Sequence, residues 1–402
     1  MQAPLESSKC ARRHPDRIGK VLAGRNGIIS ALYEDLIDTS FESDKDIARL
    51  RYTPGGAFSS RRHKLKSIEQ NRAGYERLIE VFATHDIGYF FYNGGGDSQD
   101  TSHKVAQLSL EVGYPMQCIG IPKTIDNDLP STDNCPGFGS VAKYVATSIR
   151  EAAFDLQSMA ATPTKIFVLE VKGRHAGWIA AAGALAAQSE RDAPQIVVLP
   201  EVAFDQQRFL ARVKDSVDRF GYCALVVSEG AHYADGSFLA DSGEKDAFEH
   251  AQLGGVAPVL ARLINTQLGY KFHWAVADYL QRTARHIASA TDVEQAYRLG
   301  EAAVELALDE HTAEMPIIRR LADEPYRWDI SHVPLEKVAN LEKTVPPEFI
   351  SADGFGITPA CRRYLAPLII SEDPPPYVDG LPDYVRLKNV AVERRIRSAF
   401  SL

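Results

Sequence analysis

Several short apolar stretches, each ending in glycine or a polar side chain, constrain the fold of this chain more than any other feature of its sequence. They are residues 87–92, 116–121, 164–171, 195–201 and 223–230. Apolar runs of this length between turn residues are typical of buried strands in a parallel sheet. Apolar residues at helical spacing lie between them, for instance over residues 71–83, and this alternation predicts an α/β fold. At 402 residues the chain is too long for one ordinary core, so we expect two domains.

Composition and charge narrow the class of protein. Hydrophobic residues make up 45% and charged residues 24% of the chain, which is typical of a globular protein and excludes a disordered or fibrous one. The net charge of -8 argues against nonspecific binding of nucleic acid, and no apolar run is long enough to span a membrane. The five cysteines are widely spaced, without a Cys-x-x-Cys pair or a secretory leader. They indicate a cytoplasmic protein with reduced thiols and no zinc site.

The loop Ile121–Asp128 carries the densest group of reactive side chains. It follows a predicted strand, and parallel sheets bind ligands at the carboxyl ends of their strands. Lys123, Thr124, Asp126 and Asp128 together are suited to hold a phosphate, accept a proton from a hydroxyl and orient a metal ion. The alternative is a pair of acids that cap the N-terminus of a helix.

A run of three glycines follows the stretch 87–92, within Asn-Gly-Gly-Gly-Asp-Ser. Glycine lets backbone N–H groups approach a phosphate, and the following helix offers its positive end, so Gly95, Gly96 and Ser98 are candidates for phosphate binding. Tight turns also use glycine. Because the carboxylate of Asp97 repels phosphate, we expect this residue either to bind Mg²⁺ or to exclude one kind of ligand.

Further charged residues stand at the ends of other predicted strands. The segment Lys172–Arg174 again places glycine beside cations, and Glu229 either accepts substrate hydroxyls or caps a helix. His175 is either catalytic or a packed or capping histidine. Arg282 is a candidate to reach a phosphate. The basic loop Ser59–Lys64 suits an anion or is simply solvated.

Taken in order, the motifs Gly-Gly-Gly-Asp-Ser, Pro-Lys-Thr-Ile-Asp-Asn-Asp, Gly-Arg-His-Ala-Gly-Trp, Ser-Glu-Gly and Tyr-Leu-Gln-Arg resemble those of the 6-phosphofructokinases. The resemblance runs from about residue 15 to the C-terminus and is to the pyrophosphate-dependent branch. It implies the phosphofructokinase fold, with two Rossmann-like domains and parallel-rich sheets. We expect a shortened donor-binding domain over residues 1–160 and a sugar-phosphate domain over 161–345. A C-terminal extension over 346–402 would pack back on them and end in a basic helix.

The resemblance also implies an activity, which is reversible Mg²⁺-dependent transfer from pyrophosphate to the 1-hydroxyl of fructose 6-phosphate. This reaction belongs to glycolysis and gluconeogenesis, and a cytoplasmic homodimer is expected. In the family pattern Asp126 is the general base, with Lys123, Thr124 and Arg62 acting on the transferring phosphoryl group. Pyrophosphate would lie at Gly95, Gly96, Asp97 and Ser98, and Mg²⁺ near Asp97 or Asp128. The sugar phosphate would contact Thr124, Ile125, Asp126, Lys172, Gly173, Arg174, Glu229, Tyr279, Leu280, Gln281 and Arg282.

Two positions bear on the phosphoryl donor. ATP-using relatives have glycine in place of Lys123 and in place of Asp97. In the family, the aspartate occupies space that the ATP α-phosphate would need, and the lysine stabilises the group transferred from pyrophosphate. An ATP-dependent phosphofructokinase is therefore the weaker alternative within catalysis.

The chain departs from the family pattern at three places. It starts almost at the second strand and lacks the first strand, glycine loop and helix that hold the donor. Lys172 stands where relatives have methionine, and Gly96 where many have an acid. Loss of a strand would expose unpaired backbone groups and lower stability. A truncated or non-catalytic subunit is therefore a further hypothesis.

Overall fold

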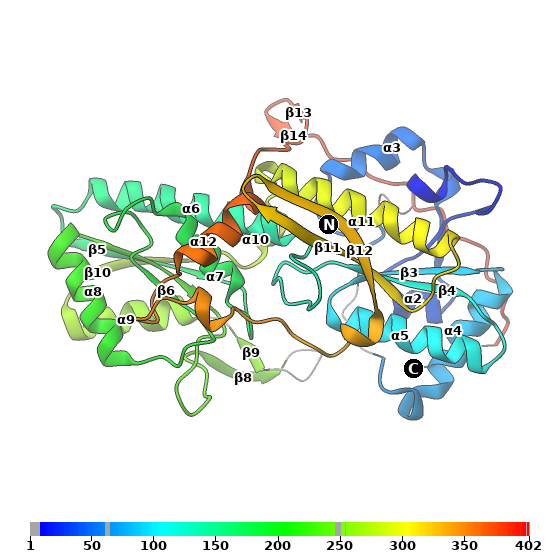
Figure 1. The fold of residues 1–402 in the computed structure, drawn as a ribbon, viewed down its shortest axis with the longest axis horizontal. Coiled ribbons are helices and arrows are strands. Elements are labelled where there is room, and N and C mark those ends of the chain that lie inside the picture. Colours follow the sequence, from blue (N-terminus) through cyan, green and yellow to red (C-terminus); the bar gives the residue numbers. More distant parts are fainter. Residues whose placement is uncertain (1–8, 61–64, 246–250, 254, 399, 402) are drawn as a thin grey trace.

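The computed structural model describes residues 9–60, 65–245, 251–253, 255–398 and 400–401 of the chain. Two four-stranded sheets lie side by side along its long axis (Figure 1). The strand order is β12-β11-β4-β3 in the first sheet and β10-β5-β7-β6 in the second. Helices cover both sheets, so the predicted α/β class is confirmed.

The first sheet is packed between helices on its two faces. Its strands are β3 (Tyr89–Gly94), β4 (Gln117–Pro122), β11 (Glu314–Asp323) and β12 (Tyr326–Pro334). The helices are α4 (Ile68–Thr84), α5 (Gly96–Glu111) and α11 (Ala290–Leu308). Successive strand side chains point to opposite faces. Accordingly, Cys118 joins the core under α4 and α5, while Ile119 and Ile121 pack against α11.

The second sheet is entirely parallel and is covered by helices on both faces, except along one exposed edge strand. Its strands are β5 (Thr164–Val171), β6 (Ile196–Val198), β7 (Cys223–Ser228) and β10 (Lys271–Val276). The helices α6 (Phe138–Ser158) and α7 (Trp178–Gly183) share one core, and α8 (Gln206–Phe220) and α9 (Val256–Leu268) share the other. Val168 faces α8 and α9, whereas Leu169 faces α6 and α7, as the two-residue strand period requires.

The remaining elements are short. They comprise β1 (Leu22–Gly24), α2 (Ile28–Leu32), β2 (Leu36–Asp38), α3 (Asp44–Arg49), β8 (Asp241–Lys245), β9 (Ala251–Leu253), α10 (Asp278–Thr283), α12 (Pro359–Leu365), β13 (Tyr377–Val378) and β14 (Leu381–Pro382). In the part of the chain that the structure describes, seven 3₁₀ helices lie at 39–41, 50–52, 184–186, 285–287, 335–337, 347–349 and 366–369. Among the described helices, none has the length and apolar character to cross a membrane.

The last part of the chain returns to the N-terminal elements instead of forming the predicted basic helix. The described residues 383–398 contain no helix. Their backbone is used elsewhere, because the Asp38 amide donates to the Val390 carbonyl at 2.9 Å and the Val392 amide donates to Leu36 at 2.8 Å. The helix prediction was wrong because it considered only the local pattern of charges, whereas β2 offers this segment backbone partners from far away in the sequence.

Other predicted elements are confirmed with shifted ends. The predicted stretches 87–92, 195–201 and 223–230 form the strands Tyr89–Gly94, Ile196–Val198 and Cys223–Ser228. The limits of 1–160, 161–345 and 346–402 stay a prediction.

Asp292 of α11 caps the N-terminus of α6, and so connects a helix of the first sheet to a helix of the second. Its carboxylate accepts hydrogen bonds from the amide of Gly137 at 2.8 Å and the amide of Ser140 at 3.1 Å, at the N-terminus of α6. These are amides that the helix itself cannot satisfy. The helix that leads away from the Ile121–Asp128 loop is thus fixed to the helix that covers the first sheet.

Replacing Asp292 with alanine should therefore lower stability. Because buried amides of Gly137 and Ser140 lose their acceptor, we expect the free energy of unfolding in urea to fall by about 1–3 kcal/mol. Asp309→Ala, at the exposed C-terminal end of the same helix, is the control and should change it by less than about 0.5 kcal/mol. Equal stability of the two variants would contradict the capping role.

Candidate active site

A cleft of about 2020 Å³ lies where the carboxyl ends of strands from both sheets meet. This position is expected for ligand sites in parallel sheets. Of the residues proposed from the sequence, the cleft is lined by Gly95, Gly96, Asp97, Ser98, Lys123, Thr124, Ile125, Asp126, Asp128, Lys172, Arg174, Glu229, Tyr279, Gln281 and Arg282. Gly173 and Leu280 do not line it. Arg62 lies outside the described residues.

Asp126 stands in the loop after β4, half-buried in the cleft. Burial raises the pKa of its carboxyl group to about 7, and the charges of Asp128 and Glu229 add to this effect. Lys123 and Lys172 act in the opposite direction. A carboxylate with a pKa near 7 is suited to accept a proton at neutral pH.

Asp128 shares this loop, and one of its carboxylate oxygens is unsatisfied by the described residues. Burial raises the pKa of its carboxyl group. Its Oδ1 atom is buried and has no hydrogen-bond partner among the described residues. A buried oxygen in this state calls for a ligand. The predicted alternative, in which the two aspartates cap a helix, is wrong, because α6 begins only at Phe138 and Asp292 caps it.

The glycine run at the end of β3 brings the N-terminus of α5 to the cleft. Gly94 permits this turn, because a Cβ there would lie 2.0 Å from the Ser98 hydroxyl. The buried side-chain amide of Gln99 donates to the carbonyls of Gly94 at 2.8 Å and of Ile121 at 3.1 Å. Gln99 thereby holds the ends of β3 and β4 side by side, with Asp97 in the first helical turn.

Strands of the second sheet bring a charged cluster to the opposite wall. The Lys172 ammonium lies 2.9 Å from the Glu229 carboxylate and 3.0 Å from that of Asp278. Burial alone would lower the pKa of Lys172, but these two acids outweigh it and the pKa is raised. Lys172, where the family resemblance implies methionine, is therefore held by acids at the ends of β7 and β10. No described helix begins at Glu229, so the capping alternative for this residue is wrong.

The short helix α10 adds a polar edge to the cleft. The Arg282 guanidinium lies 4.9 Å from the centre of the Tyr279 ring. Gln281 is only 2% exposed, and neither polar atom of its side-chain amide has a partner among the described residues. This leaves one donor and one acceptor for a ligand. Leu280 is exposed and points elsewhere.

His175 lies at the rim of the cleft beside an acid. Its Nδ1 atom is 3.0 Å from the Glu342 carboxylate, and both side chains are about half exposed. This exposure excludes a packed histidine, and the catalytic and capping interpretations stay predictions.

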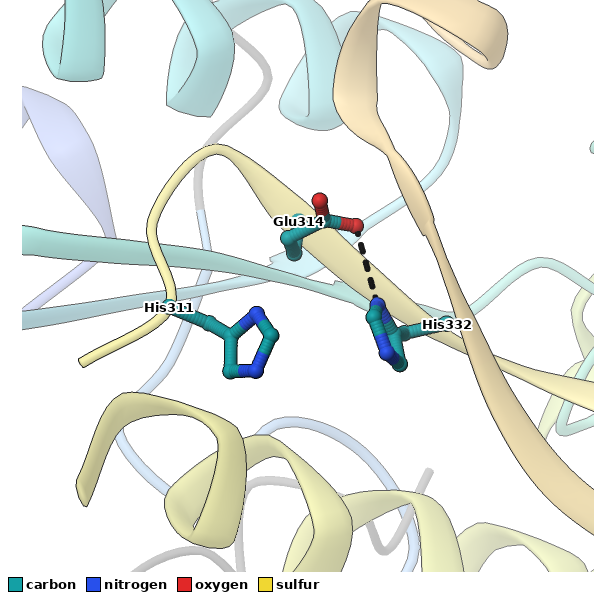
Figure 2. A group of neighbouring side chains, drawn as sticks. All are labelled: His311, Glu314 and His332. Carbon is teal, nitrogen blue, oxygen red and sulfur yellow. Dashed lines mark hydrogen bonds and ion pairs between the residues drawn. The ribbon is translucent and has the colours of Figure 1, made fainter. Parts of the chain in front are cut away.

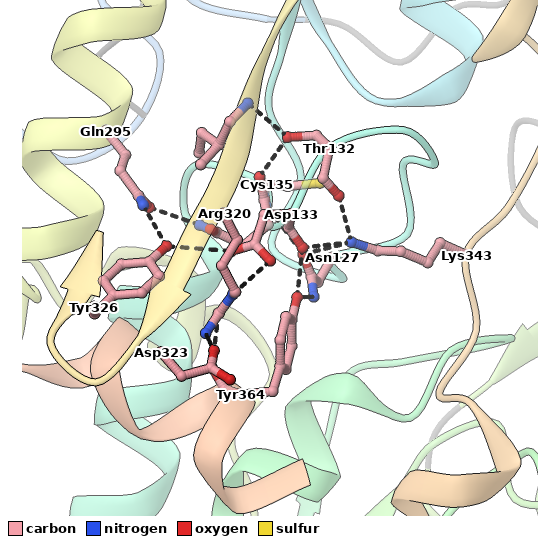
Figure 3. A network of polar contacts seen from close by, with 12 residues as sticks. Asn127, Thr132, Asp133, Cys135, Gln295, Arg320, Asp323, Tyr326, Lys343 and Tyr364 are labelled. Atoms are coloured by element: carbon pink, nitrogen blue, oxygen red, sulfur yellow. Dashed lines mark hydrogen bonds and ion pairs between the residues drawn. The ribbon is translucent and has the colours of Figure 1, made fainter. Parts of the chain in front are cut away.

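A polar network beneath the loop was not predicted from the sequence (Figure 3). Asn127 is buried with φ of +55°, a conformation that asparagine tolerates better than most residues. Its Oδ1 atom accepts from the Cys135 amide at 3.0 Å, and its side-chain NH₂ donates to the Tyr364 hydroxyl at 3.1 Å. Asn127 thereby fixes the backbone between Asp126 and Asp128.

Lys343 is the central cation of this network. Its ammonium group donates to the carbonyls of Asp133 at 2.9 Å and Thr132 at 3.0 Å, and its backbone amide donates to the Asp128 carbonyl at 2.7 Å. Burial lowers the pKa of Lys343. Lys343 and Tyr364 follow the loop by more than 200 residues, and no local motif marks them. Only the fold connects them to the site.

Comparisons with known proteins agree with the motifs. The family model "Phosphofructokinase" matches residues 9–307. The chain is 64% identical over 405 residues to the pyrophosphate--fructose 6-phosphate 1-phosphotransferase of Methylococcus capsulatus, covering 100% of this chain and 96% of that protein. It is similar to the crystal structure of the pyrophosphate-dependent phosphofructokinase from Nitrosospira multiformis, with a TM-score of 0.92, 59% identity and coverage of 99% and 95%. The corresponding enzyme from Marinobacter aquaeolei gives a TM-score of 0.90 at 56% identity, with coverage of 100% and 97%.

Removing the Lys343 ammonium should loosen the loop. In Lys343→Met the carbonyls of Thr132 and Asp133 lose a buried donor, so we expect amide hydrogen exchange over residues 124–135 to speed up by at least roughly tenfold, equivalent to about 1.4 kcal/mol. Exchange in β6 and β7 should not change. Lys337→Met, at an exposed position, is the control. Unchanged exchange in the loop of Lys343→Met would show that the ammonium does not hold it.

Proposed function

Because the chain belongs to the phosphofructokinase family, we propose that its cleft transfers a phosphoryl group reversibly between pyrophosphate and the 1-hydroxyl of fructose 6-phosphate. The observation that carries this proposal is the half-buried carboxylate of Asp126, with a pKa near 7, between cations on both walls. The two highly similar relatives named above for Methylococcus and Nitrosospira are pyrophosphate-dependent enzymes, which supports the choice of donor.

Asp126 acts as the general base in this proposal. It takes the proton of the sugar 1-hydroxyl while the hydroxyl oxygen forms a bond to the terminal phosphorus of pyrophosphate. The bond from that phosphorus to the bridging oxygen breaks, and orthophosphate leaves. The Thr124 hydroxyl accepts a hydrogen bond from the backbone amide of Asp126 at 3.1 Å. This bond helps to hold the Asp126 carboxylate in place within the loop. Transfer of this kind depends on positioning and charge neutralisation more than on covalent chemistry.

The donor would lie between α5 and the loop after β4. The N-terminus of α5 brings the backbone of Gly96 and the side chain of Ser98 to the cleft, and Lys123 supplies a cation to the transferring group. Asp97 in the first turn places a negative charge where a longer nucleotide would continue. We infer that Asp97 disfavours the binding of ATP. Arg62 is proposed as a further cation that contacts the transferring phosphoryl group.

The sugar phosphate would lie against the second sheet. Glu229 accepts sugar hydroxyls, with Lys172 setting its orientation through their 2.9 Å contact. Arg174, Arg282 and the unsatisfied amide of Gln281 are proposed to hold the 6-phosphate and neighbouring hydroxyls. Thr124, Ile125, Lys172, Gly173, Tyr279 and Leu280 complete the proposed sugar-phosphate set.

The residues present fit a magnesium ion. Asp128 offers a buried carboxylate oxygen without a protein partner among the described residues, and Asp97 offers a second carboxylate in the same cleft. Oxygen ligands of this kind are the ones that Mg²⁺ prefers. When bound there, Mg²⁺ would neutralise charge on the pyrophosphate oxygens.

We also propose that the protein is a homodimer that associates through β10. This strand pairs only with β5 among the described residues, and it exposes Trp274 by 46%, with Val276, Tyr279 and Leu280 also exposed. An apolar sheet edge of this kind is typical of an interface. Sedimentation equilibrium should give twice the 44.3 kDa mass of one chain, and a mass of one chain would contradict the dimer.

The function is tested with the purified chain, Mg²⁺ and fructose 6-phosphate, with either pyrophosphate or ATP as donor. We expect fructose 1,6-bisphosphate to form with pyrophosphate and much more slowly with ATP. Asp126→Asn should lower kcat by roughly 10²–10⁴-fold while sugar-phosphate binding persists. Preference for ATP would favour the ATP-dependent alternative. A folded chain that uses neither donor would favour the non-catalytic one.

The rate should depend on the ionisation of Asp126. Because only the carboxylate accepts a proton, kcat/KM should fall as the pH drops below about 7. Glu229→Gln removes a negative charge that raises the pKa of Asp126. It also releases Lys172 from its ion pair with Glu229, and the charge of Lys172 lowers the same pKa. The acid limb of the pH profile should therefore move to lower pH. The substrates titrate identically with both enzymes, so comparing their pH profiles isolates the protein group. An unchanged limb would show that another group titrates.

A further inference from the structure

Two histidines and a glutamate converge at a place remote from the cleft in the fold. Potential ligand atoms of His311, Glu314 and His332 all lie within 4.8 Å of one another. Figure 2 shows the two imidazole rings and the carboxylate pointing toward a common point. The Nδ1 atom of His332 is 3.3 Å from the Glu314 carboxylate, and the two ring centres are 5.0 Å apart. The proposed reaction uses none of these three side chains.

The register of the β11–β12 hairpin brings Glu314 and His332 together. His332 lies opposite Pro316, and Glu314 lies opposite Pro334. Residues two apart share a face of the sheet, so Glu314 and His332 are diagonal neighbours on one face. His332 and Glu314 keep 43% and 18% of their side-chain surface exposed, so an ion from solvent reaches them.

The turn from α11 to β11 supplies His311. Its first part is closed by the His311 amide, which donates to the Leu306 carbonyl at 3.0 Å. The Thr312 hydroxyl then donates to the Met116 carbonyl at 3.0 Å and accepts from the Cys118 amide at 3.1 Å. These bonds fix the backbone on both sides of the His311 side chain to α11 and β4.

We propose that His311, Glu314 and His332 bind one divalent transition-metal ion of the zinc type. Two imidazoles and one carboxylate are a known protein ligand set for Zn²⁺, with water in the remaining position. Imidazole nitrogen also favours such ions over Mg²⁺, which prefers oxygen ligands alone. The distances between the ligand atoms require only small side-chain movements for all three to contact one ion.

The position points to a structural role for the ion. Thr312 is attached at Met116 and Cys118, at the start of β4, whereas the cleft lies beyond the end of β4 at Pro122. A bound ion would connect the end of α11, β11 and β12 at the edge of the sheet opposite the chemistry. The cysteine spacing predicted no zinc site, and it does not bear on histidines that are brought together by the hairpin register.

The test is calorimetric titration of the chelator-treated full chain with Zn²⁺ in excess Mg²⁺, which occupies sites made of carboxylates alone. We expect one Zn²⁺ per chain. His311→Ala, His332→Ala and the nearly isosteric Glu314→Gln should each weaken binding by at least roughly tenfold, since loss of even an outer-shell partner costs about that much. His286→Ala, which removes an exposed histidine outside β10, should leave the affinity unchanged.

X-ray absorption of the zinc-loaded wild type gives a readout that does not depend on any variant. It should show imidazole ligands at about 2.0–2.1 Å, with the protein at the same oligomeric state as before zinc was added. Failure of the wild type to bind zinc, full binding by the His311→Ala, His332→Ala double variant, or zinc held only between chains would each overturn the proposal.

Discussion

The burial of several acids in one cleft is the constraint on which this site depends. Asp97, Asp126, Asp128 and Glu229 all line one cleft, and like charges that are partly removed from water oppose one another's ionisation. Burial, to which the charges of Asp128 and Glu229 add, raises the pKa of Asp126 to about 7. A carboxyl group whose pKa is raised by folding weakens the fold once the pH exceeds its unfolded value near 4, and fully above pH 7. The same property that costs stability makes the group a base at neutral pH, and the cations of Lys123 and Lys172 limit the cost.

Such a site needs a rigid support, which comes from parts of the chain far away in sequence. Lys343 and Tyr364 hold the backbone of the loop from below, and Asp292 fixes the following helix. The last described residues then return to β2. Each support satisfies backbone groups that would otherwise be buried without partners. The acidic loop is therefore recognisable from a few adjacent residues, but its conformation in the fold depends on residues far away in the sequence.

The sequence was informative where the signal is local. The strand 164–171 and the loop after β4 were recognised because strand length, proline and glycine act on neighbouring residues. Local charge misled for the C-terminal segment, whose backbone pairs with β2. Asn127 and Lys343 were not predicted as supports of the site. The role of a buried amide or ammonium group depends on the groups that surround it in the fold, and no local sequence pattern shows these. Lys172 looked anomalous in the sequence, yet in the fold it meets Glu229 and Asp278 at the ends of parallel strands.

Strand β4 connects the cleft at its carboxyl end with the proposed metal site near its start. At its carboxyl end the chain leaves the sheet through Pro122 and presents Lys123, Thr124 and the two aspartates to the cleft. At its start, Met116 and Cys118 are fixed by the Thr312 hydroxyl, between the His311 and Glu314 ligands of the proposed metal site. Movement of β4 along its axis would break the contacts at both ends. An ion that stiffens the turn at the start of the strand would therefore also limit the displacement of the loop that presents Asp126 to the cleft.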